Sequence, residues 1–160
     1  MKPMRAALLL FVALLWVPLA RADGADARQL DRLFPRSSLQ IATPDARLHT
    51  FAVWVADDAA RRARGLMFVR ELADDAGMLF VYPSTQPVAM WMKNTFIPLD
   101  MLFVNAEGAI VHVVENTEPH SLETILSTQP VLAVIELKAG AAARLKIRPG
   151  ARVLYPAFQP

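Results

Sequence analysis

Short apolar runs recur along most of the chain, and each ends at proline, glycine, asparagine or aspartate. Runs rich in β-branched and aromatic residues, bounded by turn residues, are typical of β-strands. Many short strands joined by tight turns favour an antiparallel β-sandwich or barrel, so the chain is predicted to be mainly β and α+β only at the margin. The pattern predicts strands over residues 39–42, 49–55, 77–82, 88–92, 99–104, 109–115, 131–137 and 152–155.

Two segments depart from this β pattern and predict helices. Asp57 and Asp58 are residues that commonly cap a helix, and apolar residues follow at positions 59, 60, 63, 66 and 67. That spacing places them on one stripe of an amphipathic helix, with three arginines off the stripe. A shorter helix is predicted over residues 141–145, after Gly140. The fold class is therefore a β-sandwich or barrel with one amphipathic helix and one short helix.

The first 22 residues have the layout of a secretory signal peptide. Lys2 and Arg5 precede an apolar run over residues 6–20, and Ala20-Arg21-Ala22 forms a small-residue cleavage pattern. A membrane-spanning helix needs about 20 apolar residues, whereas this run is shorter. The interpretation is cleavage near Ala22 and export to the periplasm or the medium. Retention as an anchor is the alternative.

Charge and composition then narrow the classes of partner. The chain of 160 residues has a formal net charge of +2, but residues 1–22 hold three of its 17 basic residues and none of its 15 acidic ones. The remainder has a net charge of −1, which gives no support to a nucleic-acid partner or to a polybasic membrane contact. The sequence contains no cysteine, which excludes disulfides, thiolate metal sites and a cysteine nucleophile. No cofactor and no metal are predicted.

The domain organisation follows from the same features. Residues 1–22 are predicted to be the signal peptide, residues 23–37 a polar N-terminal arm and residues 38–157 a single β-rich domain. A length of about 100–200 residues is usual for one domain. Once the leader is removed, no stable membrane span is expected.

The densest polar cluster among apolar neighbours is Trp91-Met92-Lys93-Asn94-Thr95. Lys93 is one of three lysines beyond the leader. An ammonium, an amide and a hydroxyl in sequence can line a pocket mouth and bind one polar ligand. The alternative is a loop between strands whose Asn94 and Thr95 satisfy their own backbone.

Two carboxylates lie within apolar strands, Asp100 at the start of one and Glu136 inside another. A charged group in such a place costs free energy unless it is paired or solvated. Glu136 therefore either faces solvent or needs a cation, which Lys93, Arg64 or Lys138 could supply. A carboxylate–lysine pair in a cleft could bind a polar ligand or act in acid–base chemistry, and a structural ion pair is the alternative.

These blocks resemble the domain of unknown function 192 family. The resemblance covers about residues 41–154 and implies a compact, mainly β sandwich or barrel, often behind a signal peptide. It implies no activity, but it marks Lys93, Asn94, Asp100 and Glu136 as signature polar positions. The chain departs from the family pattern at Met90 and Ala151. The matching stretches are Arg64-Gly65-Leu66-Met67, Gly77-Met78-Leu79-Phe80, Trp91 to Thr95 with Pro98-Leu99-Asp100, Glu115-Asn116, and Val134-Ile135-Glu136-Leu137 with Gly140.

Three functional hypotheses follow. The preferred one is an exported, non-catalytic binding module for a small or polymeric polar ligand, either a saccharide or an anion. The second is a hydrolase or lyase that uses two of Asp100, Glu136 and Glu115 with Lys93, although no nucleophile-elbow, phosphate-loop or dinucleotide motif occurs. The third is a structural or partner-binding accessory of the cell envelope. The candidate ligand-binding residues are Trp91, Lys93, Asn94, Thr95, Asp100, Glu136 and Arg64.

Overall fold

The computed structural model describes residues 25–158. The predicted signal peptide, residues 1–22, lies outside the described residues. Within residues 25–158, no helix combines the length and apolar character needed to cross a membrane. The elements are α1 Ala25–Leu33, β1 Arg36–Ala42, β2 Leu48–Ala56, α2 Ala59–Arg64, β3 Ala76–Gln86, β4 Ala89–Met90, β5 Leu99–Val104, β6 Ile110–Val114, β7 Ile125–Leu126, β8 Val131–Lys138, α3 Ala141–Leu145, β9 Arg152–Leu154 and the 3-10 helix η1 Pro156–Phe158.

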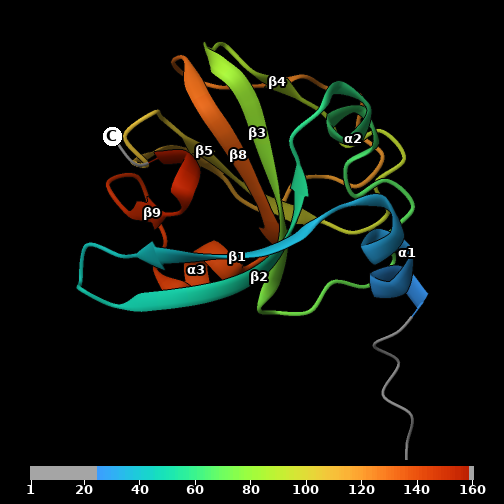
Figure 1. Ribbon diagram of the computed structural model, residues 1–160, viewed down its shortest axis with the longest axis horizontal. Helices are drawn as coiled ribbons and strands as arrows, with labels where there is room; N and C mark the ends of the chain where they lie inside the picture. The colour runs from blue at the N-terminus through green and yellow to red at the C-terminus, as the bar shows by residue number, and fades with distance from the viewer. Residues whose placement is uncertain (1–24, 159–160) are drawn as a thin grey trace, which may run out of the picture.

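Seven strands form one curled sheet in the order β6-β5-β8-β3-β2-β1-β9 (Figure 1). The two ends of the sheet meet at an antiparallel bridge between Ala109 and Arg152, and the amide of Ile110 donates to the carbonyl of Ala151 at 2.8 Å. The sheet is antiparallel except for the parallel pair β2–β3. The mainly β class is confirmed, and the sheet is a barrel rather than a sandwich.

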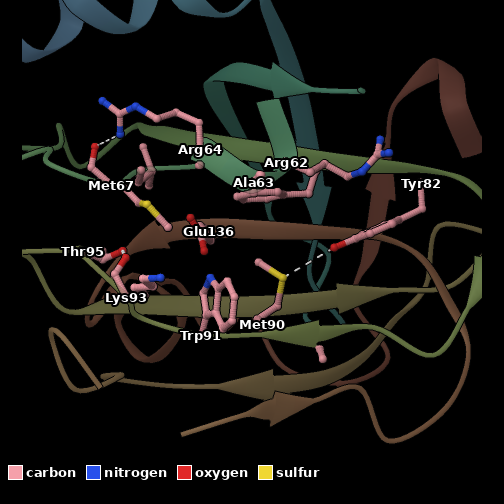
Figure 2. Close-up of a pocket in the computed structure, with 14 residues that line it drawn as sticks. Arg62, Ala63, Arg64, Met67, Tyr82, Met90, Trp91, Lys93, Thr95 and Glu136 are labelled. Atoms are coloured by element: carbon pink, nitrogen blue, oxygen red, sulfur yellow. Dashed lines mark hydrogen bonds between the residues drawn. The ribbon is translucent and has the colours of Figure 1, made fainter. Parts of the chain in front are cut away.

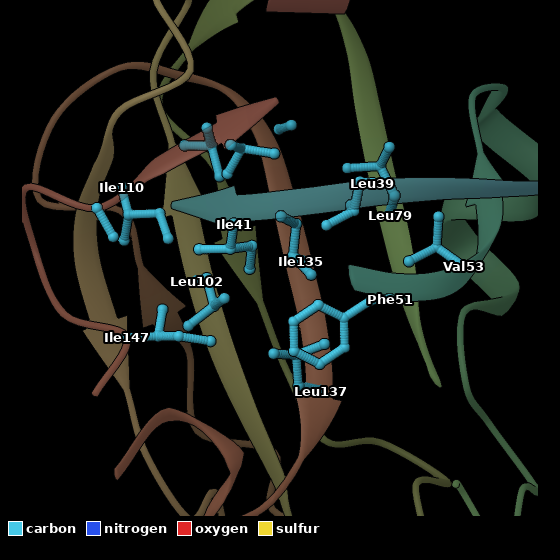
Figure 3. Packing of buried hydrophobic residues seen from close by; sticks show 14 of the residues in the cluster. Leu39, Ile41, Phe51, Val53, Leu79, Leu102, Ile110, Ile135, Leu137 and Ile147 are labelled. Atoms are coloured by element: carbon cyan, nitrogen blue, oxygen red, sulfur yellow. The ribbon is translucent and has the colours of Figure 1, made fainter. Parts of the chain in front are cut away.

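The two faces of the sheet carry separate apolar clusters. One cluster fills the inside of the barrel and includes Phe51, Leu102, Ile135 and Leu137 (Figure 3). The other covers the outer face, where residues from α1 and from the long loops pack on Met78, Phe80, Met101 and Phe103. Because side chains alternate along a strand, Ile135 and Leu137 point inward while Glu136 belongs to the outer face.

The helix predicted from the apolar stripe differs from the helix observed. α2 ends at Arg64, and none of its residues is buried. Asp58 does cap it, since its side chain accepts a hydrogen bond from the amide of Arg61 at 2.8 Å. The helix ends because Gly65 turns the chain with φ +46°. The predicted helix is therefore shorter than the apolar stripe over residues 59–67: its alanines are exposed, and Leu66, which is buried, lies in the turn after the helix.

The strand boundaries also differ in two places. β3 continues through Pro83 to Gln86, and its pairing with β8 becomes irregular between Val81 and Gln86. Proline lacks a backbone donor and is tolerated where the ladder is already broken. The strand predicted over residues 88–92 is reduced to the two residues of β4, which pair with β7 in a separate small sheet.

The N-terminal arm is more ordered than its composition predicted. Residues 25–33 form α1, whose Leu30 is buried in the outer cluster. The indole nitrogen of Trp54 donates to Asp31 at 2.8 Å. β1 begins at Arg36, three residues before the strand that the sequence predicted. The arm thus covers part of the outer face of the sheet.

Candidate functional site

A cavity of ≈ 240 Å³ opens on the outer face of the sheet, where four segments converge. Figure 2 shows the Glu136 carboxyl between Met67 on one side and Lys93 and Trp91 on the other. The lining residues come from α2 and its C-terminal turn, from β3, from β4 and the loop after it, and from β8. They are Arg62, Ala63, Arg64, Gly65, Leu66, Met67, Phe80, Tyr82, Ala89, Met90, Trp91, Lys93, Thr95 and Glu136.

Two segments that lie far apart in the chain, residues 64–68 and residues 91–95, contact each other to form part of the cavity wall. The amide of Phe68 donates to the carbonyl of Asn94 at 2.9 Å, and the Asn94 side-chain amide lies 3.9 Å from the sulfur of Met67. The Arg64 guanidinium donates to the carbonyl of Met67. These contacts fix the turn after α2 against the loop after β4. The backbone and side chain of Asn94 thus hold the cavity wall without lining the cavity.

Glu136 lies at the base of the cavity and is only 4% exposed. Within residues 25–158, its carboxyl makes no hydrogen bond and has no basic nitrogen within 4.0 Å. Burial raises the pKa of Glu136 from 4.5 to about 8. Removal from water disfavours the charged form, and no cation compensates. At pH 7 the group is therefore mostly a neutral carboxylic acid, which can both donate and accept a hydrogen bond.

One wall of the cavity combines aromatic rings with sulfur. The Tyr82 hydroxyl donates to the sulfur of Met90 at 3.6 Å. Burial raises the pKa of Tyr82; the Arg62 charge opposes this effect, and Glu136 adds to it. The Arg62 guanidinium lies 5.3 Å from the centre of the Tyr82 ring and donates to the carbonyl of Val81 at 2.8 Å. This wall thus combines an aromatic ring, a thioether and a guanidinium group.

The mouth of the cavity is positively charged. Trp91 is 53% exposed, and the Lys93 ammonium lies 5.7 Å from the centre of its ring. Within the described residues, Arg62, Arg64 and Lys93 have no carboxylate oxygen within 4.0 Å. Three unpaired cations therefore line a cavity whose single acidic residue is mostly neutral at pH 7. No group of three His, Asp or Glu side chains in residues 25–158 is arranged to hold a metal ion.

The structure brings together five of the seven predicted site residues. Trp91, Lys93, Thr95, Glu136 and Arg64 all line the cavity, whereas Asn94 supports it from behind. Thr95 is buried, and its hydroxyl donates to the carbonyl of Lys93 at 3.4 Å.

Asp100 does not line the cavity, and its carboxylate instead bonds to backbone amides of the fold. It pairs with Leu137 in the ladder between β5 and β8, while Met101 pairs with Glu136. Asp100 therefore faces the inside of the barrel, opposite to Glu136. Its two carboxylate oxygens accept hydrogen bonds from the amides of Asn116 and Ala142, at 2.9 and 2.8 Å.

The carboxylate pair that the enzyme hypothesis needs is not assembled. Asp100 and Glu136 lie on opposite faces of the sheet, and Glu115 is exposed beyond the end of β6. Paired acid–base chemistry needs two carboxyl groups within about 5–10 Å across one cleft. In the described residues, the cavity lining contains one carboxyl group.

Nine lining residues were not among the predicted site residues, and four of them have large side chains that shape the walls: Arg62, Met67, Tyr82 and Met90. Arg62 adjoins the predicted Arg64, and Tyr82 stands before the proline in the run over residues 77–83. They lie on or beside three different elements, α2, β3 and β4, and no local motif groups them. Only the packing of α2 over the sheet brings them together.

The fold and site define a closed β-sheet domain with a basic pocket over a buried carboxyl group. The chain belongs to the DUF192 family, described as "Uncharacterized ACR", whose model matches residues 40–155. No functionally curated protein is significantly similar to the chain.

Two crystal structures share this fold. One, from Sinorhizobium meliloti 1021, is described as a "putative transcription regulator". It is 43% identical, has a TM-score of 0.76, and the match covers 78% of this chain and 96% of that one. The other is a protein of unknown function from Novosphingobium aromaticivorans DSM 12444. It is 34% identical, has a TM-score of 0.73, and the match covers 75% of this chain and 85% of that one.

Proposed function

We propose that this protein is an exported binding module whose pocket holds a small polar ligand with both hydroxyl groups and an anionic group, such as an acidic sugar. The observation that carries the proposal is Glu136, a buried carboxyl with no partner in residues 25–158, beneath a mouth with three unpaired cations. The Glu136 oxygens are not among the fully buried, unpartnered polar atoms of the described residues, so they can be reached from the cavity. A ligand would supply the missing hydrogen bonds.

The chemistry of the lining supports this class of ligand. A neutral carboxylic acid can donate to one ligand oxygen and accept from a hydroxyl, whereas its ionised form would repel an anion. Lys93 and the two arginines can pair with a carboxylate on the ligand. The exposed face of Trp91 offers an apolar surface to the C–H groups of a sugar ring.

The size of the cavity agrees with a small ligand. Its volume of ≈ 240 Å³ lies below the range of about 300–1,000 Å³ that is typical for drug-sized ligands. The single carboxyl in the lining favours binding over hydrolysis by a carboxylate pair. The third hypothesis, a structural accessory, does not account for an unpaired acid inside a pocket.

Binding is expected for D-galacturonate, measured by isothermal titration calorimetry at pH 6.5. Lys93→Ala and Trp91→Ala each weaken the affinity about tenfold, because each removes one contact worth about 1.4 kcal/mol. Lys146→Ala is the matched control, since this exposed lysine lies outside the cavity lining and should leave the affinity unchanged. Galacturonate binding that survives both pocket substitutions would place the ligand elsewhere, and no binding of this probe would contradict the proposal.

Export is tested separately from binding. In the full-length chain expressed in a bacterium with two membranes, we expect cleavage after Ala22 and a mature protein in the periplasmic fraction. Intact-mass spectrometry of that fraction should show a chain that begins at Asp23. A full-length chain that stays with the membrane fraction would instead support a retained anchor.

A further inference from the structure

Beyond the wall of the cavity lies a strip of three aromatic rings, which we define as Phe68, Phe96 and His120. The ring centres of Phe68 and Phe96 are 5.9 Å apart, and those of Phe96 and His120 are 5.1 Å apart. The strip begins one residue after Met67, which lines the cavity. Arg64 lines the cavity and also lies over the Phe68 ring, so the strip adjoins the pocket.

Phe68 is held toward solvent at a conformational cost. It is 48% exposed and has a φ of +68°, a backbone region that bulky residues rarely adopt. Its amide donates to the carbonyl of Asn94, which itself has a φ of +56°. Strained residues of this kind persist where the surrounding structure holds them, and they cluster at binding sites. Burial in the core does not explain a side chain that remains half exposed.

Two arginines lie over the rings of the strip. The Arg64 guanidinium carbon is 4.9 Å from the centre of the Phe68 ring, and that of Arg70 is 4.7 Å from the centre of the Phe96 ring. Neither arginine has a carboxylate oxygen within 4.0 Å in residues 25–158. The Asp26 carboxylate accepts hydrogen bonds from the amides of Arg70 and Glu71. The strip is thus aromatic and basic, like the mouth of the pocket.

We infer that this strip is a second subsite and that the ligand is a chain of acidic sugars rather than a single unit. The inference rests on the proposed function of the pocket. One sugar unit occupies the cavity over Glu136, and the next packs against Phe68 and Phe96. Arg64, which lines the cavity and also lies over Phe68, contacts the carboxylates of both units.

Single-stranded nucleic acid also binds aromatic rings beside cations, but two observations favour the saccharide. Phe68 and Phe96 meet edge to face, at 84°, so they do not present parallel faces to successive bases. Residues 25–158 contain 14 basic and 14 acidic residues, so the described part of the chain has no net positive charge. A phosphate backbone is bound chiefly through such an excess.

The test compares D-galacturonate with tetragalacturonate in calorimetric titrations of the full chain after processing. We expect the tetramer to bind at least tenfold more tightly than the monomer. Phe68→Ala should reduce tetramer affinity to the monomer level. Arg70→Ala should weaken tetramer binding and leave monomer affinity unchanged, because Arg70 does not line the cavity. Leu154→Ala is the matched control, because Leu154 is 49% exposed and lies outside both the cavity lining and the strip. Arg70→Ala, at an exposed position, provides a second variant should Phe68→Ala fail to fold.

The outcomes separate the two proposals. Equal affinities for monomer and tetramer would overturn the second subsite and leave the pocket standing. Monomer binding that is lost in Phe68→Ala would show that the strip is part of the pocket and is not a separate subsite. No binding of either saccharide would overturn both proposals. If a decamer of deoxythymidine displaces the tetramer, and Phe68→Ala abolishes binding of that decamer, the strip is assigned to nucleic acid instead.

Discussion

Replacement of Asp100 with alanine is expected to lower the free energy of unfolding by about 3–5 kcal/mol. The Asp100 side chain is fully buried, and its two oxygens accept hydrogen bonds from the amides of Asn116 and Ala142. Hydrogen bonds to a charged group contribute about 1.5–3 kcal/mol each, and a buried amide that loses its partner adds a desolvation cost. Urea denaturation followed by circular dichroism measures the change.

Asp74→Ala is the matched control for this experiment. The Asp74 carboxylate pairs with Lys138 at 2.8 Å, but both side chains are largely exposed. Exposed ion pairs contribute about 0–1 kcal/mol, so the stability should change little. Asp100→Asn keeps one acceptor oxygen and should fall between the alanine variant and the wild type. A loss below about 1 kcal/mol in Asp100→Ala would contradict the structural role assigned to this carboxylate.

The stability of the wild-type protein is expected to fall as the pH rises from about 5 to 8. Burial raises the pKa of Glu136 from 4.5 to about 8, so between these values the folded state keeps a proton that the unfolded state releases. Stability falls with pH wherever the folded state binds more protons. Each pH unit within this window costs about 1.4 kcal/mol, and the full effect is about 3–5 kcal/mol.

Glu136→Gln is the variant that isolates this effect. Glutamine has nearly the same shape but does not titrate, so the difference in unfolding free energy between wild type and variant should grow from pH 5 to pH 8. It should level off above pH 8, where Glu136 is ionised in both states. The measurement is a series of urea denaturation curves at fixed ionic strength. If the free energies of unfolding of wild type and variant instead change with pH in parallel, Glu136 is ionised in the folded state at neutral pH.

The contrast between these two carboxyl groups bears on function. Asp100 is buried with both oxygens bonded, whereas Glu136 is buried with neither oxygen bonded in the described residues. The first arrangement stabilises the fold. The second lowers stability at neutral pH, and groups of this kind with perturbed pKa values occur preferentially at functional sites. Glu136 is therefore the residue on which the proposed binding function most depends.

Local patterns predicted those elements that local chemistry forms. The hairpin over residues 99–115 is confirmed as β5 and β6, and Gly108 adopts a φ of +76° in its turn. The continuous apolar run over residues 131–137 is β8, because both faces of this central strand are covered by apolar clusters. Short-range turn residues and apolar runs suffice for such elements.

Elements that depend on distant partners were not predicted. β7 has only Ile125 and Leu126, and it exists because it pairs with β4. The parallel pairing of β2 with β3 follows from the path of the chain through α2, which no local pattern records. In α2 the apolar stripe predicted a buried face, but the termination at Gly65 leaves the alanines exposed. In the first two cases a long-range pairing decided the element, whereas in α2 the turn at Gly65 ended the helix.

Local sequence patterns were enough to predict the family, the mainly β class and five of the residues that line the candidate site. These follow from apolar runs, turn residues and the Trp91 to Thr95 block, all of which are contiguous in the chain. The three-dimensional packing was needed to assign one of the two buried carboxyl groups to the pocket. Asp100 and Glu136 look alike in sequence, but the antiparallel register of β5 and β8 directs them to opposite faces of one sheet. A shift of one residue in that register would place both carboxyl groups on the same face.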